Sequence, residues 1–178
     1  GDDKELLKKL AREKAPVEKV VLDMVVKHLP SPVEAQKYRI KKIWKGDINS
    51  PVGQAMVNLD PNGSLIINIT NVIIDKVSKQ ELATGRIFSG TLRKGDEVYL
   101  ASQKRKVKLQ QIAIWKGIQR IPVDEITAGN IVAIVGGRGL YAGETIIGNV
   151  ENPESVEPFE ELKHWLEPVV TKSFEPKN

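Results

Sequence analysis

Short apolar runs separated by turn residues recur along this 178-residue chain from about Lys37 onward. The runs begin at intervals of roughly ten residues, a spacing typical of an antiparallel β-sandwich or β-barrel. A closed barrel removes the strand edges that would otherwise pair with other chains, so this many strands favour closure. The sequence therefore predicts a mainly β fold, a closed antiparallel β-barrel in which helices are scarce. The predicted runs are 54–59, 65–75, 82–92, 97–101, 106–115, 130–135 and 145–150.

Two amphipathic helices are predicted before the first strand. Residues 4–14 place three leucines on one face, and residues 17–29 form a second apolar face. The segment Pro30-Ser31-Pro32 ends the second helix, because proline cannot continue the helical hydrogen-bond ladder. From the residues alone, the two helices are interpreted as a cap on the following sheet.

The stretch 83–100 has the pattern of a β-hairpin. Two apolar, β-branched stretches flank the turn Arg93-Lys94-Gly95-Asp96, whose glycine can take a positive φ and whose aspartate can close the turn. Gly85 and Gly90 lie inside the first strand, where glycine marks a bulge, a barrel corner or a close approach of another backbone. The bending of a small barrel is the favoured interpretation, and a contact role for a partner is the alternative.

The composition limits the compartment and the chemistry. The chain has no cysteine, which rules out disulfides and thiolate metal sites, and its formal net charge is +4. No apolar run reaches the length of a membrane span, and residues 1–5 lack the features of a signal peptide. We therefore expect a cytoplasmic protein with no membrane partner, whose mild positive charge permits contact with phosphate backbones without requiring it.

Motifs that would support an enzyme are weak. The chain lacks G-x-x-x-x-G-K-[ST] and an Asn-Lys-x-Asp guanine-reading pattern, so we expect it not to bind GTP by itself. Asp60-Pro61-Asn62-Gly63 and the stretch 137–142 match the letters of nucleotide motifs, but their context favours a turn and a loop. His28 and His164 have no neighbour at metal-ligand spacing. The sequence predicts no catalytic, cofactor-binding or metal-binding residue.

The sequence offers more residues suited to contact a nucleic acid than residues suited to catalysis. Hydroxyls of Ser89 and Thr91 alternate with apolar neighbours and can position a nucleic acid without reading its sequence. For the basic residues, charge alone favours the alternative of an ordinary solvated surface. A secondary basic patch consists of Lys104, Arg105, Lys106 and Lys108.

Several separated motifs occur together in the order of one known family. The stretch 83–100, followed by Gln110-Gln111-Ile112, Trp115-Lys116-Gly117 and residues 128–133, resembles the second domain of translational GTPases. The flanking segments resemble archaeal or eukaryotic elongation factor 2: they are residues 35–40, 44–50 and 60–63, with 167–171 and 175–178 resembling the entry into the third domain. The resemblance runs from about Val21 to Asn178.

This resemblance implies a fragment with three parts. Residues 1–32 would be the helical end of a GTP-binding domain, 33–150 the β-barrel of domain II, and 151–178 a linker into a third domain. The parent would promote GTP-dependent ribosomal translocation as a GTPase holding GTP and Mg²⁺, whereas the fragment itself would be a monomer without enzymatic activity or cofactor. Its implied partners are small-subunit ribosomal RNA and the GTP-binding domain of the same protein.

The resemblance also implies which residues face the RNA or the switch region of the GTP-binding domain. The candidates are Arg86, Ser89, Gly90, Thr91, Arg93 and Lys94. Two other functions stay open: a stand-alone RNA-binding β-barrel, which predicts salt-dependent RNA affinity, and a module that docks on protein surfaces, which predicts binding insensitive to salt.

Overall fold

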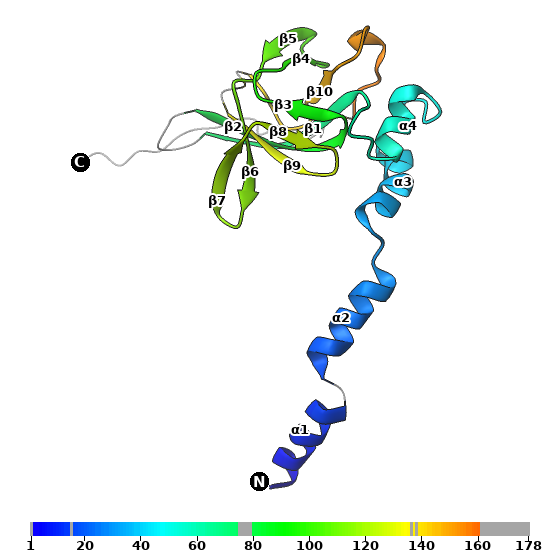
Figure 1. Cartoon of the computed structure of the whole chain (residues 1–178), viewed down its shortest axis with the longest axis vertical. Helices are drawn as coiled ribbons and strands as arrows, with labels where there is room; N and C mark the ends of the chain where they lie inside the picture. The colour runs from blue at the N-terminus through cyan, green and yellow to red at the C-terminus, as the bar shows by residue number, and fades with distance from the viewer. Residues whose placement is uncertain (1, 15, 75–79, 136, 138, 161–178) are drawn as a thin grey trace, which may run out of the picture.

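The structure, a computed structural model, describes residues 2–14, 16–74, 80–135, 137 and 139–160. Helices lead into a body of strands (Figure 1). The helices are α1 (Asp2–Lys14), α2 (Val17–His28), α3 (Pro32–Ile43) and α4 (Pro51–Val57), with a 3-10 turn at Pro153–Ser155. The strands are β1 (Leu65–Ile74), β2 (Glu81–Ser89), β3 (Thr91–Arg93), β4 (Glu97–Leu100), β5 (Arg105–Lys108), β6 (Gln111–Lys116), β7 (Gln119–Val123), β8 (Glu125–Thr127), β9 (Ile131–Val135) and β10 (Thr145–Gly148).

The strands form one large sheet and one short ribbon around a common apolar core. The sheet has eight strands in the order β5-β4-β10-β1-β2-β9-β6-β7, and β3 pairs with β8 in the ribbon. The pairs are antiparallel, which confirms the predicted mainly β, antiparallel fold. Ile67 and Ile134 of the sheet share the core with Leu92 and Ile126 of the ribbon. In the described residues β5 and β7 end the sheet without a shared ladder, so the closure of the barrel stays a prediction.

Gly85 in β2 lies where the backbones of β1 and β2 come close together. It pairs with Ile69, next to a register shift between Ile69 and Asn71. A Cβ atom on Gly85 would lie 2.6 Å from the carbonyl oxygen of Asn68, closer than any side chain tolerates. This glycine therefore serves the geometry of the sheet, as the favoured interpretation predicts.

The predicted hairpin across residues 93–96 is wrong, although the turn itself forms. Arg93 N–H donates to Asp96 Oδ2 (2.7 Å), and Asp96 N–H donates to the carbonyl of Arg93 (3.1 Å). The flanking strands do not pair with each other, because β3 pairs with β8 while β4 pairs with β5 and β10. The turn is a corner where the chain leaves the ribbon and enters the sheet.

Helices α3 and α4 correct the prediction that helices are scarce after Lys37. The run 54–59, predicted as a strand, lies largely in α4. Each helix has a serine cap followed by a proline at the first helical turn, a combination that favours helix initiation. Ile40 of α3 and Met56 of α4 pack in a second buried cluster against Ile66 of β1. The prediction also missed β7 and β8, and the run 106–115 divides into two strands, β5 and β6.

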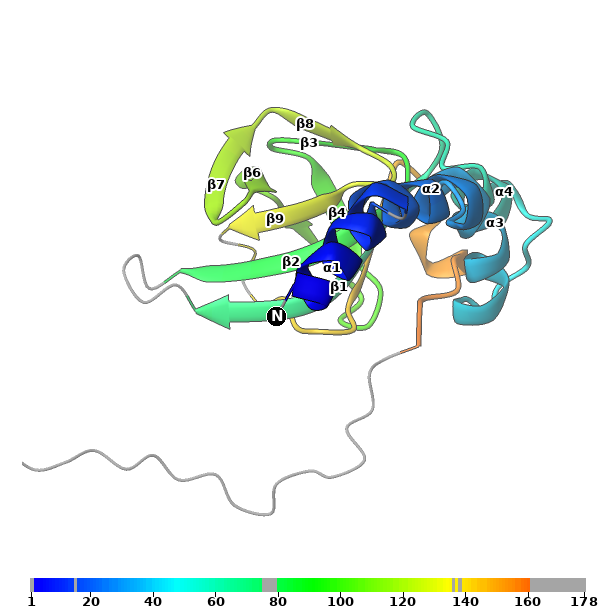
Figure 2. The same cartoon turned by 90° about the horizontal axis from the view of Figure 1, so that it is seen from below.

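Helices α1 and α2 form where the sequence predicts helices, but they do not cap the sheet. Residues 3–14 of α1 are exposed and no residue of α2 is buried. Figure 1 shows the two helices running away from the strands, and in Figure 2, which looks from below, α1 therefore lies in front of the strands. Among the described residues, no helix combines the length and apolar character that crossing a bilayer requires.

Replacing Ser31 with alanine should lower the free energy of unfolding by about 1 kcal/mol, because the N-cap of α3 is lost. The Ser31 hydroxyl accepts from Glu34 N–H (3.3 Å), and Glu34 Oε2 accepts from Ser31 N–H (2.9 Å). These hydrogen bonds lower the pKa of Glu34. The contribution of Glu34 to stability is therefore fully present above the ordinary carboxyl pKa and is lost as the pH falls through the lowered pKa. Urea unfolding at neutral and acidic pH measures both effects. Ser102→Ala, at an exposed turn position, is the control, and an equal loss there would contradict the capping role.

Candidate partner-binding surfaces

The corner at residues 93–96 is fixed by hydrogen bonds to two other segments. Lys94 N–H donates to the carbonyl of Asp124 (2.9 Å), and Gly95 N–H donates to the carbonyl of Leu109 (2.8 Å). Because these backbone donors are used within the fold, the corner offers an anion its two basic side chains rather than a nest of N–H groups. Both basic side chains are exposed.

Arg93 has an acidic neighbour across the ribbon. Its Nε lies 3.5 Å from Glu125 Oε2, and the exposed fractions of the two side chains are 63% and 62%. Because an exposed pair of this kind contributes at most about 1 kcal/mol, a partner can displace it. Arg93 is therefore available to an anionic group.

The secondary basic patch lies along β5, the strand at one end of the sheet. Lys106 Nζ lies 3.7 Å from Glu97 Oε1, and a Cβ atom on Gly95 would lie 3.9 Å from Lys108 Cε. Lys108 thus brings the patch next to the corner. Under the solvated-surface alternative, these cations only keep the terminal strand from pairing with the edge of another sheet. We call the combined set the basic corner surface: Arg93, Lys94, Lys104, Arg105, Lys106 and Lys108.

Ser89 and Gly90 belong to the internal framework instead of a contact surface. Ser89 is fully buried and its hydroxyl donates to the carbonyl of Ser64 (2.6 Å). Gly90 is buried as well, and its N–H donates to the carbonyl of Asp60 (2.8 Å). Thr91 is half-buried and donates its hydroxyl to the carbonyl of Pro61 (2.7 Å). Burial corrects the prediction that Ser89 and Gly90 face a partner, and the Thr91 hydroxyl proton is already used.

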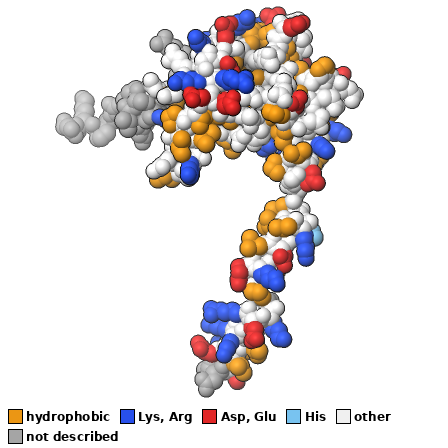
Figure 3. All heavy atoms as spheres, in the orientation of Figure 1, with side chains coloured by type: hydrophobic (Ala, Val, Ile, Leu, Met, Phe, Trp, Pro, Cys, Tyr) orange, Lys and Arg blue, Asp and Glu red, His pale blue; other side chains and the backbone are white. Residues whose placement is uncertain are grey.

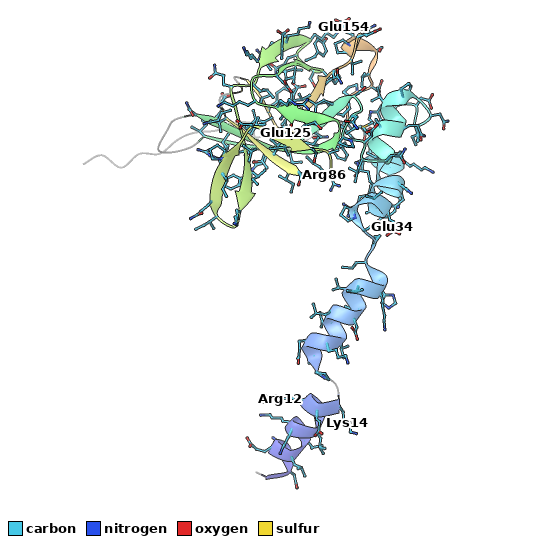
Figure 4. All side chains as sticks on the ribbon, in the orientation of Figure 1. Arg12, Lys14, Glu34, Arg86, Glu125 and Glu154 are labelled. Atoms are coloured by element: carbon cyan, nitrogen blue, oxygen red, sulfur yellow. The ribbon has the colours of Figure 1, made fainter. Side chains whose placement is uncertain are left out.

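Arg86 does not join the basic corner surface. It lies in the middle of β2, paired with Asn68 and Ile131, and its Nη2 donates to Gln36 Oε1 of α3 (3.1 Å). Its guanidinium carbon lies 5.5 Å from the centre of the Phe88 ring. Figure 4 shows Arg86 on the side of the strands next to α3. Sequence reasoning selected Arg86 but missed Gln36, which is fifty positions away in the chain.

The motifs that resemble nucleotide sites form turns and loops where the structure describes them. Asn62 N–H donates to Asp60 Oδ1 (2.9 Å), so residues 60–63 make the predicted turn. No helix follows Val135 within the described part of the stretch 137–142. The described residues contain no group of three or more His, Asp or Glu side chains placed to hold a metal ion. His164 and residues 161–178 of the expected linker lie outside the described residues.

Comparison with known proteins identifies the region from β2 to β10. Residues 80–147 match the family model described as elongation factor Tu domain 2. The whole chain is 52% identical to elongation factor 2 of Nanoarchaeum equitans, covering 24% of that protein, and 53% identical to elongation factor 2 of Pyrococcus furiosus, covering 23%. The chain belongs to the elongation factor 2 family.

A third member of the elongation factor 2 family, from Thermococcus onnurineus, is 52% identical over 96% of the chain and is covered over 22% of its own length. The chain therefore spans about a quarter of the length of these relatives. This confirms the resemblance found in the sequence and assigns the strands to a translation elongation factor domain.

Proposed function

We propose that the chain is the domain II region of an elongation factor 2 that promotes GTP-dependent translocation on the cytoplasmic ribosome. In this proposal residues 1–32 belong to the end of the GTP-binding domain, 33–150 form domain II and 151–178 lead into a third domain. The sheet and the ribbon act together as a closed barrel. GTP and Mg²⁺ are held by the GTP-binding domain, and this region contributes no catalytic group.

The basic corner surface is the proposed contact with small-subunit ribosomal RNA. The observation that carries this is the corner itself: Arg93 and Lys94 are exposed on a turn whose backbone is fixed by hydrogen bonds to Asp124 and Leu109. Cations on a rigid base can neutralise phosphates without first being ordered, which reduces the entropy lost on binding. Such contacts position a domain on RNA without reading its sequence.

The second proposed contact is with the rest of the GTP-binding domain, and it is supported by the exposed apolar side chains of α1 and α2, which form the end of that domain in this proposal. Leu7 is 65% exposed and Val26 is 82% exposed. Apolar side chains are visible along both helices in Figure 3. A protein surface covering these helices would remove this apolar area from water. The same observation favours the alternative of a protein-docking module without RNA contact.

The double substitution Arg93→Glu and Lys94→Glu should weaken binding of the chain to purified small ribosomal subunits by at least about tenfold. It should also flatten the dependence of log K on log salt by about two, one for each lost phosphate contact. Binding is measured by co-sedimentation over a series of salt concentrations. The matched control is Lys19→Glu with Lys27→Glu on exposed α2, which makes the same change in net charge. Equal losses in the two variants, or binding insensitive to salt, would overturn the RNA contact.

A further inference from the structure

Arg86 is a half-buried cation at the junction of β2 and α3, and no acidic side chain in the described part of the chain pairs with it. Its described hydrogen bond is to a neutral group, Gln36 Oε1 (3.1 Å). Burial lowers the pKa of the Arg86 guanidinium, and the positive charge of nearby Arg39 on α3 lowers it further. Among the described residues, no ion pair involves Arg86 or Arg39; the pairs are Lys45–Glu160, Arg93–Glu125 and Lys106–Glu97.

Two hydrogen-bond donors at this junction are buried and find no acceptor among the residues that the structure describes. They are Arg86 Nε and Gln36 Nε2, and the Gln36 side chain is fully buried. A buried donor without a partner destabilises a fold by about 1–3 kcal/mol, so native proteins contain few of them. The amide oxygen of Gln36 is already occupied by Arg86. The junction therefore lacks an acceptor oxygen rather than a donor.

The charges decide what kind of acceptor fits. A neutral carbonyl would leave the repulsion between Arg86 and Arg39 unchanged, whereas an anionic oxygen offsets both charges and accepts from a guanidinium edge in a bidentate manner. Arg86 is half-buried as a residue although its Nε is buried, so an anion that approaches from solvent meets the Nη groups of the guanidinium first. The group that fits is an anion with two acceptor oxygens.

The surroundings favour a protein over RNA as the source of that anion. Ile131, the ladder neighbour of Arg86, is 58% exposed, and Val33, one turn before Gln36 on α3, is 46% exposed. Arginine among exposed apolar side chains is the composition of a protein interface, and RNA contacts are mainly polar and basic. In Figure 4 Arg86 lies on the side of the body toward which the apolar helix α2 extends.

We propose that Arg86, Arg39 and Gln36 form a receptor for an aspartate or glutamate side chain on a protein surface that packs against β2, β9 and α3. This inference deepens the protein-docking part of the proposed function and rests on it. The carboxylate binds the Nη groups of Arg86, beside Arg39, and reaches the buried Nε and the Gln36 amide only through the guanidinium and its hydrogen bond. Binding gives Arg86 an anionic partner. The ion pair then fixes the position of the sheet relative to the docked protein.

The test is a titration of the chain with sodium acetate at constant ionic strength, followed by ¹H–¹⁵N NMR of the Arg86 Nε–H and the Gln36 side-chain amide. Acetate should shift both signals in a saturable manner. Arg86→Lys should weaken acetate binding by about tenfold, because an ammonium cannot make the bidentate contact. Arg39→Gln, at an exposed position that needs no repacking, should weaken it by about twofold to fivefold. Arg93→Lys is the matched control and should leave both shifts unchanged.

Three results would overturn the inference: no saturable shift with acetate, equal weakening by Arg93→Lys, or binding of inorganic phosphate at least tenfold tighter than acetate. The last result would assign the junction to a phosphate backbone. Because the titration uses neither ribosomes nor RNA, its failure leaves the result of the co-sedimentation experiment unaffected, and the two proposals are tested separately.

Discussion

Replacing Gly90 with alanine will lower the free energy of unfolding by about 3–5 kcal/mol. Gly90 has a φ of +77°, a conformation that costs an L-residue about 1–2 kcal/mol. The added Cβ would also lie 2.6 Å from Leu65 Cα and 2.8 Å from Leu65 N. These are backbone atoms, which cannot rotate away as a side chain can. Urea unfolding followed by circular dichroism gives the change directly.

Movement of the Gly90 backbone to relieve this clash would break two further contacts. Its N–H donates to the carbonyl of Asp60 (2.8 Å), and its carbonyl accepts from Ala128 N–H (2.9 Å). Gly117→Ala is the matched control, because Gly117 has a φ of +61° and no atom within 4 Å of the added Cβ. It should lose only about 1 kcal/mol. Equal losses at the two positions would show that the close approach to Leu65 contributes nothing.

Local signals predicted those parts of the fold that depend on neighbouring residues in the chain. Periodicity of apolar residues located α1, α2 and most strands, and glycines in a strand pattern located the irregular β1–β2 ladder. The pairing of β3 with β8 joins residues more than thirty positions apart. No turn signal specifies such a partner, so the favourable turn sequence at residues 93–96 predicts a hairpin that the fold does not contain.

Two errors had signals that were present in the sequence. Ser31-Pro32 followed by Glu34 is a capping box, which marks the start of α3. Ser89 lies two residues after Ile87 of the core, and strand alternation places such residues on the same face. Its burial was therefore predictable. The junction of Arg86 with Gln36 was not, because it depends on how α3 packs against β2.

Replacing Glu144 with alanine should lower the free energy of unfolding by about 3 kcal/mol, because removal of its buried carboxylate takes the acceptor from two backbone N–H groups and leaves Gln103 Nε2 only its bond to the carbonyl of Gly139 (2.7 Å). Glu144 is fully buried. Its Oε1 accepts from Ser102 N–H (2.9 Å) and Thr145 N–H (3.2 Å), and its Oε2 accepts from Gln103 Nε2 (3.0 Å). The carboxylate thus ties the turn between β4 and β5 to the start of β10.

The same substitution connects stability to the proposed RNA contact. Gln103 also accepts from Arg105 Nε (2.9 Å) and donates to the carbonyl of Gly139, so the loss of Glu144 leaves the turn that presents Lys104 and Arg105 held by fewer hydrogen bonds. We expect Glu144→Ala to weaken binding to small ribosomal subunits under conditions where the variant is still folded by circular dichroism. Glu97→Ala is the control: Glu97 is exposed and its pair with Lys106 spans 3.7 Å, so its loss should change stability by less than about 1 kcal/mol. Undiminished binding by folded Glu144→Ala would show that the basic corner surface functions without this support.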